Sequence, residues 1–131
     1  MFQARGTIRY YYNWVMAWLE EDDLLAYYRA LMPRAIGVQP PMRPAHISIV
    51  RLFEEVPDSH RSAWGRHEGQ SIIVDYEPGI HSDGIYFWLD AWSDEVGYIR
   101  RSLGLSTFRE YDGFSSYGCY HITIGNTKNG N

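Results

Sequence analysis

Cysteine and lysine are almost missing from this chain of 131 residues, which holds only Cys119 and Lys128 of these two types. One cysteine cannot form an internal disulfide, so we expect a protein of the reducing cytoplasm in which Cys119 is a small buried hydrophobe. No apolar run is long enough to cross a bilayer, and no hydrophobic signal region follows the first residues. A membrane partner is therefore not expected.

Positive charge is also scarce, because 12 Lys and Arg stand against 16 Asp and Glu, a net charge of −4. A long nucleic acid would favour an extended basic face, and this composition argues against such a partner. A small nucleotide needs only a local positive site. Every basic residue except Lys128 is an arginine, whose planar fork suits phosphates and bases, although drift in composition explains this bias equally well.

Hydrophobic residues make up 45% of the chain and aromatic residues 16%. This content is enough for one globular domain, spanning residues 1–131, with a substantial core.

Two histidines stand in the same local pattern, as His46-Ile47-Ser48-Ile49 and His121-Ile122-Thr123-Ile124. Side chains alternate between the two faces of a β-strand, so each segment predicts a strand that buries its aliphatic pair. The imidazole and the hydroxyl then share the other face. The alternative interpretation is that both histidines are ordinary, partly buried strand residues.

The surrounding pattern predicts an α+β protein. Strands are expected at 7–12, 71–76, 84–92 and 120–125, with Trp14–Leu19 extending or following the first. Helices are expected from Asp22 to Pro33, with a stripe of Leu24, Leu25, Tyr28 and Leu31, and from a Ser93 cap to Gly104, with a stripe of Val96, Ile99 and Leu103. Turns are expected at 77–79 and 82–84, and His81 is expected in the loop between two hairpin strands. A polar loop is expected at 53–70, with His60 and His67 on the surface. An irregular connection is expected at 105–119.

The order strand, helix, histidine strand occurs twice along the chain. Such a weak repeat predicts a duplicated β-α-β arrangement with outer helices. Each histidine strand would then take a pseudo-symmetric position near the centre of one sheet, and the two would face each other across a groove.

Two imidazoles and two hydroxyls in one cleft can cleave a phosphodiester. One histidine accepts the proton of an attacking ribose hydroxyl, and the other protonates the departing oxygen. Ser48 and Thr123 can donate hydrogen bonds to the phosphate oxygens. No metal or other cofactor is needed, and no set of three or four residues has the spacing of a zinc site. Asp75 or Asp90 completing a metal site is the alternative.

The nucleoside parts of such a substrate need flat apolar surfaces. Tyr10, Tyr12, Tyr86 and Trp88 lie on strands expected beside the histidine strands, and some of them can stack on a base. Arg43 precedes His46 by three residues in a proline-rich loop.

The paired motifs resemble those of the 2H phosphoesterase superfamily, which has a bilobal, pseudo-symmetric α+β fold and a metal-independent site. A narrower resemblance covers most of the chain and is to the tailed-phage anti-CBASS nucleases. It is carried by segments at Gly6–Tyr10, Trp18–Glu20, Tyr27–Leu31, Pro44–Arg51, Tyr86–Leu89 and His121–Lys128.

This resemblance implies an enzyme of the infected bacterial cytoplasm that degrades cyclic di- and trinucleotide immune signals. It implies that His46 and His121 are the acid–base pair, that Ser48 and Thr123 contact phosphate, and that Tyr10 and Trp88 contact the nucleotide. Ser48 stands where a threonine is also common. Only ten residues follow His121, whereas some members use a longer tail to close over the ligand.

Three other functions remain open on the sequence. The same chemistry on an RNA end, as a 2′,3′-cyclic phosphodiesterase or a 2′,5′-ligase-like repair enzyme, is the first. A sponge that binds a cyclic nucleotide without cleaving it is the second, and a structural phage protein is the third. The sequence does not assign the base and the acid between the two histidines, nor the ring size and linkage of the substrate.

Overall fold

Two long antiparallel strands, β1 (Phe2–Tyr11) and β4 (Ser71–Ser82), form the middle of a six-stranded antiparallel sheet in the computed structural model. The structure describes residues 1–21, 23–107 and 120–128, so the expectations for Asp22, for most of 105–119 and for Cys119 lie outside the described residues. The other elements are β2 (Trp14–Leu19), α1 (Asp23–Ala30), β3 (His46–Val50), β5 (Tyr86–Trp92), α2 (Asp94–Ser102) and β6 (Tyr120–Asn126), with short 3₁₀ helices at Arg34–Ile36, Phe53–Glu55 and Asp58–Ala63.

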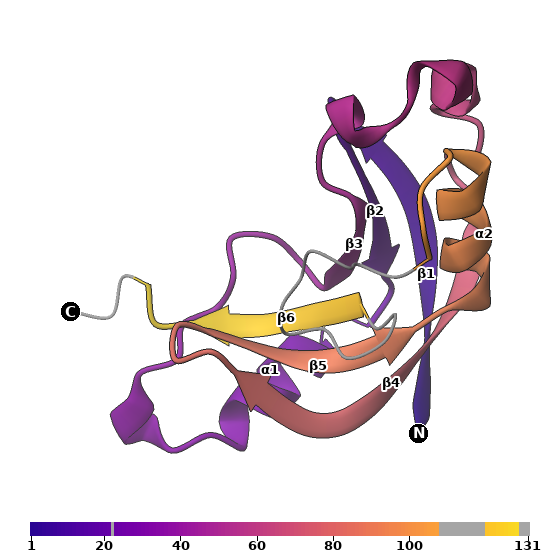
Figure 1. Ribbon diagram of the computed structural model, residues 1–131. Coiled ribbons are helices and arrows are strands. Elements are labelled where there is room, and N and C mark those ends of the chain that lie inside the picture. Colours follow the sequence, from indigo (N-terminus) through magenta and orange to yellow (C-terminus); the bar gives the residue numbers. More distant parts are fainter. Residues whose placement is uncertain (22, 108–119, 129–131) are drawn as a thin grey trace.

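The strand order is β3-β2-β1-β4-β5-β6, so the two halves of the chain contribute the same elements, strand, strand, helix and histidine strand, on either side of the β1–β4 pair. The expected β-α-β unit is therefore wrong, because Trp14–Leu19 forms a strand of its own and each half contains one strand more than that unit. The expected central position of the histidine strands is also wrong: β3 and β6 come last on each side. The sheet bends until it is nearly closed, and β3 and β6 contact each other (Figure 1).

The sequence predicted a turn at 77–79, but strand β4 continues through these residues. The register with β5 shifts between Tyr76 and Ile80, so the residues around Pro78 form an irregularity inside one strand and do not end it. Proline lacks the N–H that a regular ladder needs, and a bulge accommodates it. As a result His81 is a strand residue paired with Trp88, whereas the sequence predicted a loop.

The turn expected at 82–84 is present but lies one residue later, at 83–85, because Ser82 is still the last residue of β4. Asp83 accepts hydrogen bonds from the amides of Ile85 and Tyr86, and Gly84 has a φ of 97°, which glycine adopts without strain.

Helix α2 forms as the sequence predicts. The Ser93 hydroxyl accepts a hydrogen bond from the amide of Val96, and Val96, Ile99 and Leu103 are fully buried. Gly104 follows with a φ of 70°. Helix α1 buries Leu24, Leu25 and Tyr28, but it ends at Ala30. The side chain of Leu31 is 59% exposed, which corrects the expected stripe.

Each helix packs against the histidine strand of the other half: α1 contacts β6, and α2 contacts β3. Arg29 of α1 donates a hydrogen bond to the carbonyl oxygen of Ile124 at 2.9 Å. Arg100 of α2 donates to the carbonyl oxygen of Ile49 at 2.6 Å. The two acceptors are the last residues of the two sequence motifs, so the same contact is made twice, once in each half.

The segment 53–70 holds two 3₁₀ helices where the sequence predicts a polar loop. His60 is exposed as expected. His67 is only partly exposed: its Nε2 is buried, its Nδ1 lies 2.9 Å from Gln70, and its ring contacts that of Tyr98.

Candidate functional site

The two motif strands alternate as the sequence predicts. The motif isoleucines, Ile47, Ile49, Ile122 and Ile124, are at most 1% exposed. The imidazoles and hydroxyls of both motifs are half-buried on the opposite face. Because β3 and β6 also contact each other, the polar faces of both motifs lie in one region of the molecule.

Both motifs end in a β-bulge. Ser48 and Val50 pair with β2, while Ile49 between them has no Cα partner. On the other side Thr123 and Gly125 pair with β5, and Ile124 is the extra residue. A bulge twists and re-aims a strand, so both histidine strands turn at the same motif position.

A cavity of about 410 Å³ joins the two motifs, because His46 of β3 and Thr123 of β6 both line it. Its other lining residues come from the start of β2, the proline-rich loop, the start of β5 and the end of β6: Trp14, Pro41, Met42, Arg43, Tyr86, Asn126 and Lys128. Arg43 and Lys128 give the cavity positive charge despite the acidic balance of the chain. Arg43 was expected at the site from the sequence.

His46 is held in one orientation. Its Nδ1 lies 2.8 Å from the carbonyl oxygen of Pro44. A carbonyl oxygen only accepts hydrogen bonds, so Nδ1 carries the proton, and Nε2 of the neutral ring is a proton acceptor. The ring also packs against the indoles of Trp14, at 5.3 Å between centroids, and Trp18, at 5.6 Å.

The same surroundings lower the pKa of His46. Burial disfavours the charged imidazolium and is the largest effect, and the guanidinium of Arg43 lowers the pKa further. The hydrogen bond to Pro44 opposes both, but the net direction is downward. His46 is therefore held neutral near pH 7, the state that a general base requires.

Ser48 accepts a hydrogen bond from the indole N–H of Trp14 at 3.1 Å. The guanidinium carbon of Arg43 lies 4.7 Å from the centre of the same indole ring. With its oxygen occupied as an acceptor, the Ser48 hydroxyl can donate its own proton.

His121 stacks on Trp88 with 4.6 Å between ring centroids and 20° between ring planes. The indole N–H of Trp88 donates to one oxygen of Asp90, and the other oxygen of Asp90 lies 3.1 Å from Nε2 of His81. The indole of Trp88 is only 8% exposed. Trp88 therefore supports His121 and presents little surface to a nucleotide.

Tyr10 is not brought to the site. It lies on the face of β1 that packs against the core, whereas His46 lies on the other face of the sheet. Its ring meets that of Trp64 edge-on at 5.2 Å, and its hydroxyl accepts a hydrogen bond from the amide of His67 at 3.4 Å.

Five lining residues were absent from the sequence-based site: Trp14, Pro41, Met42, Asn126 and Lys128. Trp14 had a usable signal, because the alternation of β2 puts Trp14 and Trp18 on one face and β2 is the neighbour of β3. Asn126 and Lys128 lie in the segment His121–Lys128 that carried the resemblance, but neither was singled out there as a site residue.

Within residues 1–21, 23–107 and 120–128, no group of three or more His, Cys, Asp or Glu side chains could hold a metal ion. None of the described helices has the length and apolar character needed to cross a membrane. Comparisons with protein-family models, with curated proteins and with solved structures found no match for this chain.

Proposed function

We propose that this protein is a metal-independent phosphodiesterase that opens cyclic di- or trinucleotides, with His46 as the general base and His121 as the general acid. The proposal includes membership of the 2H phosphoesterases, whose duplicated fold agrees with the matching order of elements in the two halves. The observation that carries it is the 2.8 Å contact between Nδ1 of His46 and the carbonyl oxygen of Pro44, from which the tautomer of His46 follows. Its Nδ1–H is fixed by Pro44, and its neutral Nε2 is available beside a positively charged cavity.

The reaction is an in-line transfer at phosphorus. Nε2 of His46 takes the proton of the ribose 2′-hydroxyl, whose oxygen forms a new bond to the phosphorus. The bond from phosphorus to the departing ribose oxygen breaks, and the imidazolium of His121 supplies the proton which that oxygen needs. The product is a linear nucleotide with a 2′,3′-cyclic phosphate at one end.

Negative charge accumulates on the non-bridging phosphate oxygens during this step. The Ser48 hydroxyl is prepared to donate to one of them, because Trp14 already occupies its oxygen. Thr123 takes the corresponding place in the other motif. Arg43 and Lys128 supply positive charge from the rim of the cavity.

A small ligand is favoured over a long nucleic acid. The cavity volume of about 410 Å³ falls within the range of small-molecule sites. Among the described residues, Arg43 and Lys128 are the two side chains with a fixed positive charge that line the cavity, and the whole chain has a net charge of −4. Tyr86, at 39% exposure, offers a ring face on which a base can stack.

The decisive experiment incubates the purified protein, in EDTA, with a panel of cyclic di- and trinucleotides and with RNA carrying a 2′,3′-cyclic phosphate. Chromatography follows the products. His46→Ala and His121→Ala should each lower the rate by about 10²–10⁴. His60→Ala is the matched control, since His60 is exposed on the 3₁₀ helix Asp58–Ala63 and should keep the wild-type rate.

Cleavage of the cyclic nucleotides that depends on both histidines would support the proposal. Cleavage of RNA ends alone would assign the same chemistry to RNA repair. Tight binding with unchanged ligand after long incubation would identify a sponge, and loss of activity in EDTA would contradict the metal-independent mechanism.

A further inference from the structure

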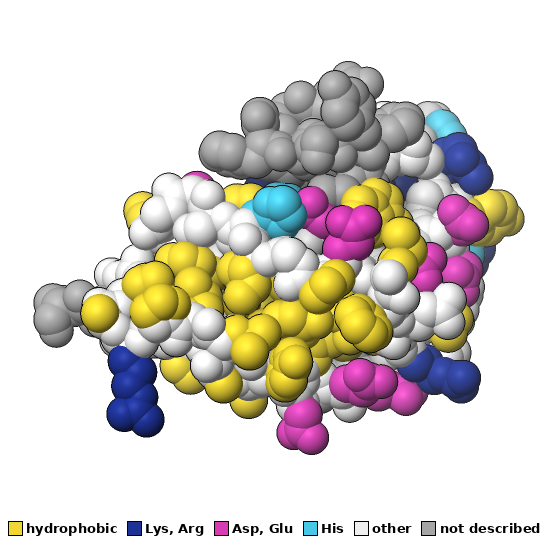
Figure 2. All heavy atoms as spheres, turned by 90° about the horizontal axis from the view of Figure 1, so that it is seen from below, with side chains coloured by type: hydrophobic (Ala, Val, Ile, Leu, Met, Phe, Trp, Pro, Cys, Tyr) yellow, Lys and Arg dark blue, Asp and Glu magenta, His cyan; other side chains and the backbone are white. Residues whose placement is uncertain are grey.

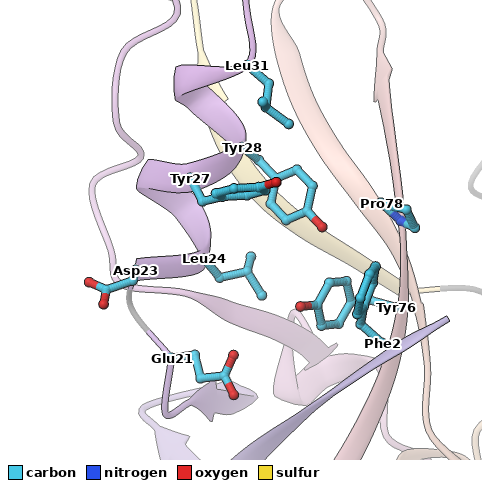
Figure 3. A pocket seen from close by; sticks show the side chains of 9 residues that line it. All are labelled: Phe2, Glu21, Asp23, Leu24, Tyr27, Tyr28, Leu31, Tyr76 and Pro78. Carbon is cyan, nitrogen blue, oxygen red and sulfur yellow. The ribbon is translucent and has the colours of Figure 1, made fainter.

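A second cavity, of about 440 Å³, lies between α1 and β4, and none of the described residues that line it also lines the histidine cavity (Figure 3). Figure 2 shows the molecule from below, where hydrophobic side chains are spread over the surface and carboxylates stand at the margin. Phe2 and Tyr27 line the cavity and are themselves 53% and 59% exposed. Nothing in the proposed phosphodiesterase reaction uses this cavity.

Aromatic rings from three elements form one connected wall of the cavity. Phe2 of β1 contacts Tyr76 of β4 at 5.8 Å between centroids. Tyr76 contacts Tyr28 of α1 at 6.4 Å, and Tyr28 contacts Tyr27 at 5.0 Å. The faces of such rings carry negative potential, so a wall of this kind favours an apolar or cationic group.

Two hydroxyl groups in the cavity have no hydrogen-bond partner within the described part of the chain. They belong to Tyr28 and Tyr76, whose side chains are only 5% and 7% exposed. Figure 3 shows both hydroxyls directed into the space between the helix and the strand. Neither hydroxyl oxygen is among the buried polar atoms that lack a partner, so both oxygens are open to the cavity and can accept a hydrogen bond from a ligand.

Carboxylates complete the lining. Glu21 and Asp23 both border the cavity, and neither forms an ion pair within the described residues. The pKa of Tyr76 is raised by burial first and then by the nearby Tyr28 and Glu21. Glu21 is thus close enough for its charge to act on the Tyr76 hydroxyl.

We propose that this cavity binds a small organic cation that carries N–H donors on an apolar body, such as a primary alkylammonium or a guanidinium. The ring faces attract the positive charge and pack against the apolar body. The oxygens of Tyr28 and Tyr76 accept the N–H groups, and Glu21 and Asp23 supply opposite charge. A nucleotide or another anion is excluded by the same groups.

Three probes with one phenylethyl body separate these contributions by calorimetry or NMR titration. Phenethylammonium has charge and N–H donors, phenethyltrimethylammonium has charge without donors, and N-acetylphenethylamine has no charge. We expect the first to bind most tightly, the second about 2–10-fold more weakly because the hydroxyl contacts are lost, and the third most weakly.

Conservative variants assign the contacts to residues. Tyr76→Phe keeps the ring and should weaken binding of phenethylammonium about 2–10-fold while leaving the trimethyl probe unchanged. Glu21→Gln should weaken both charged probes and leave the neutral probe unchanged. Tyr98→Phe, on the exposed surface of α2, and Glu20→Gln, beside Glu21 but outside the cavity lining, are the matched controls.

Equal binding of all three probes, or no effect of Tyr76→Phe on a protein whose melting temperature is unchanged, would overturn the proposal. A concentration-dependent dimer that binds no probe would also overturn the proposal, because a second copy of the chain would then occupy this face. The titrations are independent of the phosphodiesterase proposal, because His46→Ala should bind the probes as the wild type does.

Discussion

Arg100 reaches from α2 in the second half of the chain to the carbonyl oxygen of Ile49 in the first half, at 2.6 Å. Its side chain is 3% exposed and contacts no carboxylate in the described residues. Ile49 is the extra residue of a bulge and lies on the outermost strand of its side, so its carbonyl needs a partner from elsewhere. Arg29 of α1 donates a hydrogen bond to the carbonyl oxygen of Ile124 in the same way.

This contact predicts a stability change for Arg100→Met, which keeps the apolar stem and removes the donors. The carbonyl oxygens of Ile49 and Ser106 then lose the hydrogen bonds that Arg100 donates to them. We expect the free energy of unfolding to fall by about 1–3 kcal/mol in urea titrations. Arg101→Met, at the exposed neighbouring position, should change it by less than about 0.5 kcal/mol. Equal stability of both variants would show that the crossed contact is not needed.

The lowered pKa of His46 predicts the acidic side of the pH–rate profile. A general base acts only when it is deprotonated, so kcat/KM should stay high on acidification until the pH falls below about 6.5, the usual histidine value. Arg43→Met should move this limb to higher pH, because Arg43 lowers the pKa of His46. A limb that stays in place in Arg43→Met, or one that lies above pH 6.5 in the wild type, would contradict the role of His46 as base.

Trp14→Phe should lower kcat/KM by about 2–10-fold, because the Ser48 hydroxyl loses the indole donor that orients it. The measurement is a double-mutant cycle with Ser48→Ala, in which the effect of Trp14→Phe should largely disappear. Trp64→Phe is the control, since Trp64 packs against Phe53 and Tyr10 away from the cavity. Additive effects of the two substitutions would show that Trp14 does not act through Ser48.

Gly125, directly after the second motif, has no room for a side chain. A Cβ there would lie 2.5 Å from a methyl carbon of Val38 and 2.6 Å from the carbonyl oxygen of Gln39. Gly125→Ala should therefore displace β6 and lower the free energy of unfolding by about 1–3 kcal/mol, with loss of activity. Gly79→Ala, where a Cβ meets no atom within 4 Å, is the control and should fold with wild-type stability in thermal melts.

Local patterns in the sequence predicted much of the fold. The period-2 alternation around His46 and His121 identified both strands and the faces of their side chains, because a strand sets side-chain direction residue by residue. Ser93, Val96 and Gly104 marked a helix whose cap, buried face and end depend on neighbours in the sequence.

Pairing between distant segments was beyond those patterns. The place of β3 and β6 at the two ends of the strand order depends on which strands pair with β1 and β4, and alternation does not encode that choice. Tyr10 shows the same limit: its residue type suited a nucleotide, but the register of β1 directs it into the core.

The sequence by itself thus determined the two motif strands and the alternation of their side chains, since both depend on local spacing. Only the tertiary structure decided that the sheet bends until the outermost strands meet, that Pro44 fixes the tautomer of His46, and that Trp14 and Lys128 line the same cavity as Thr123. Each of these depends on long-range packing and on the burial of particular atoms, which no local pattern records.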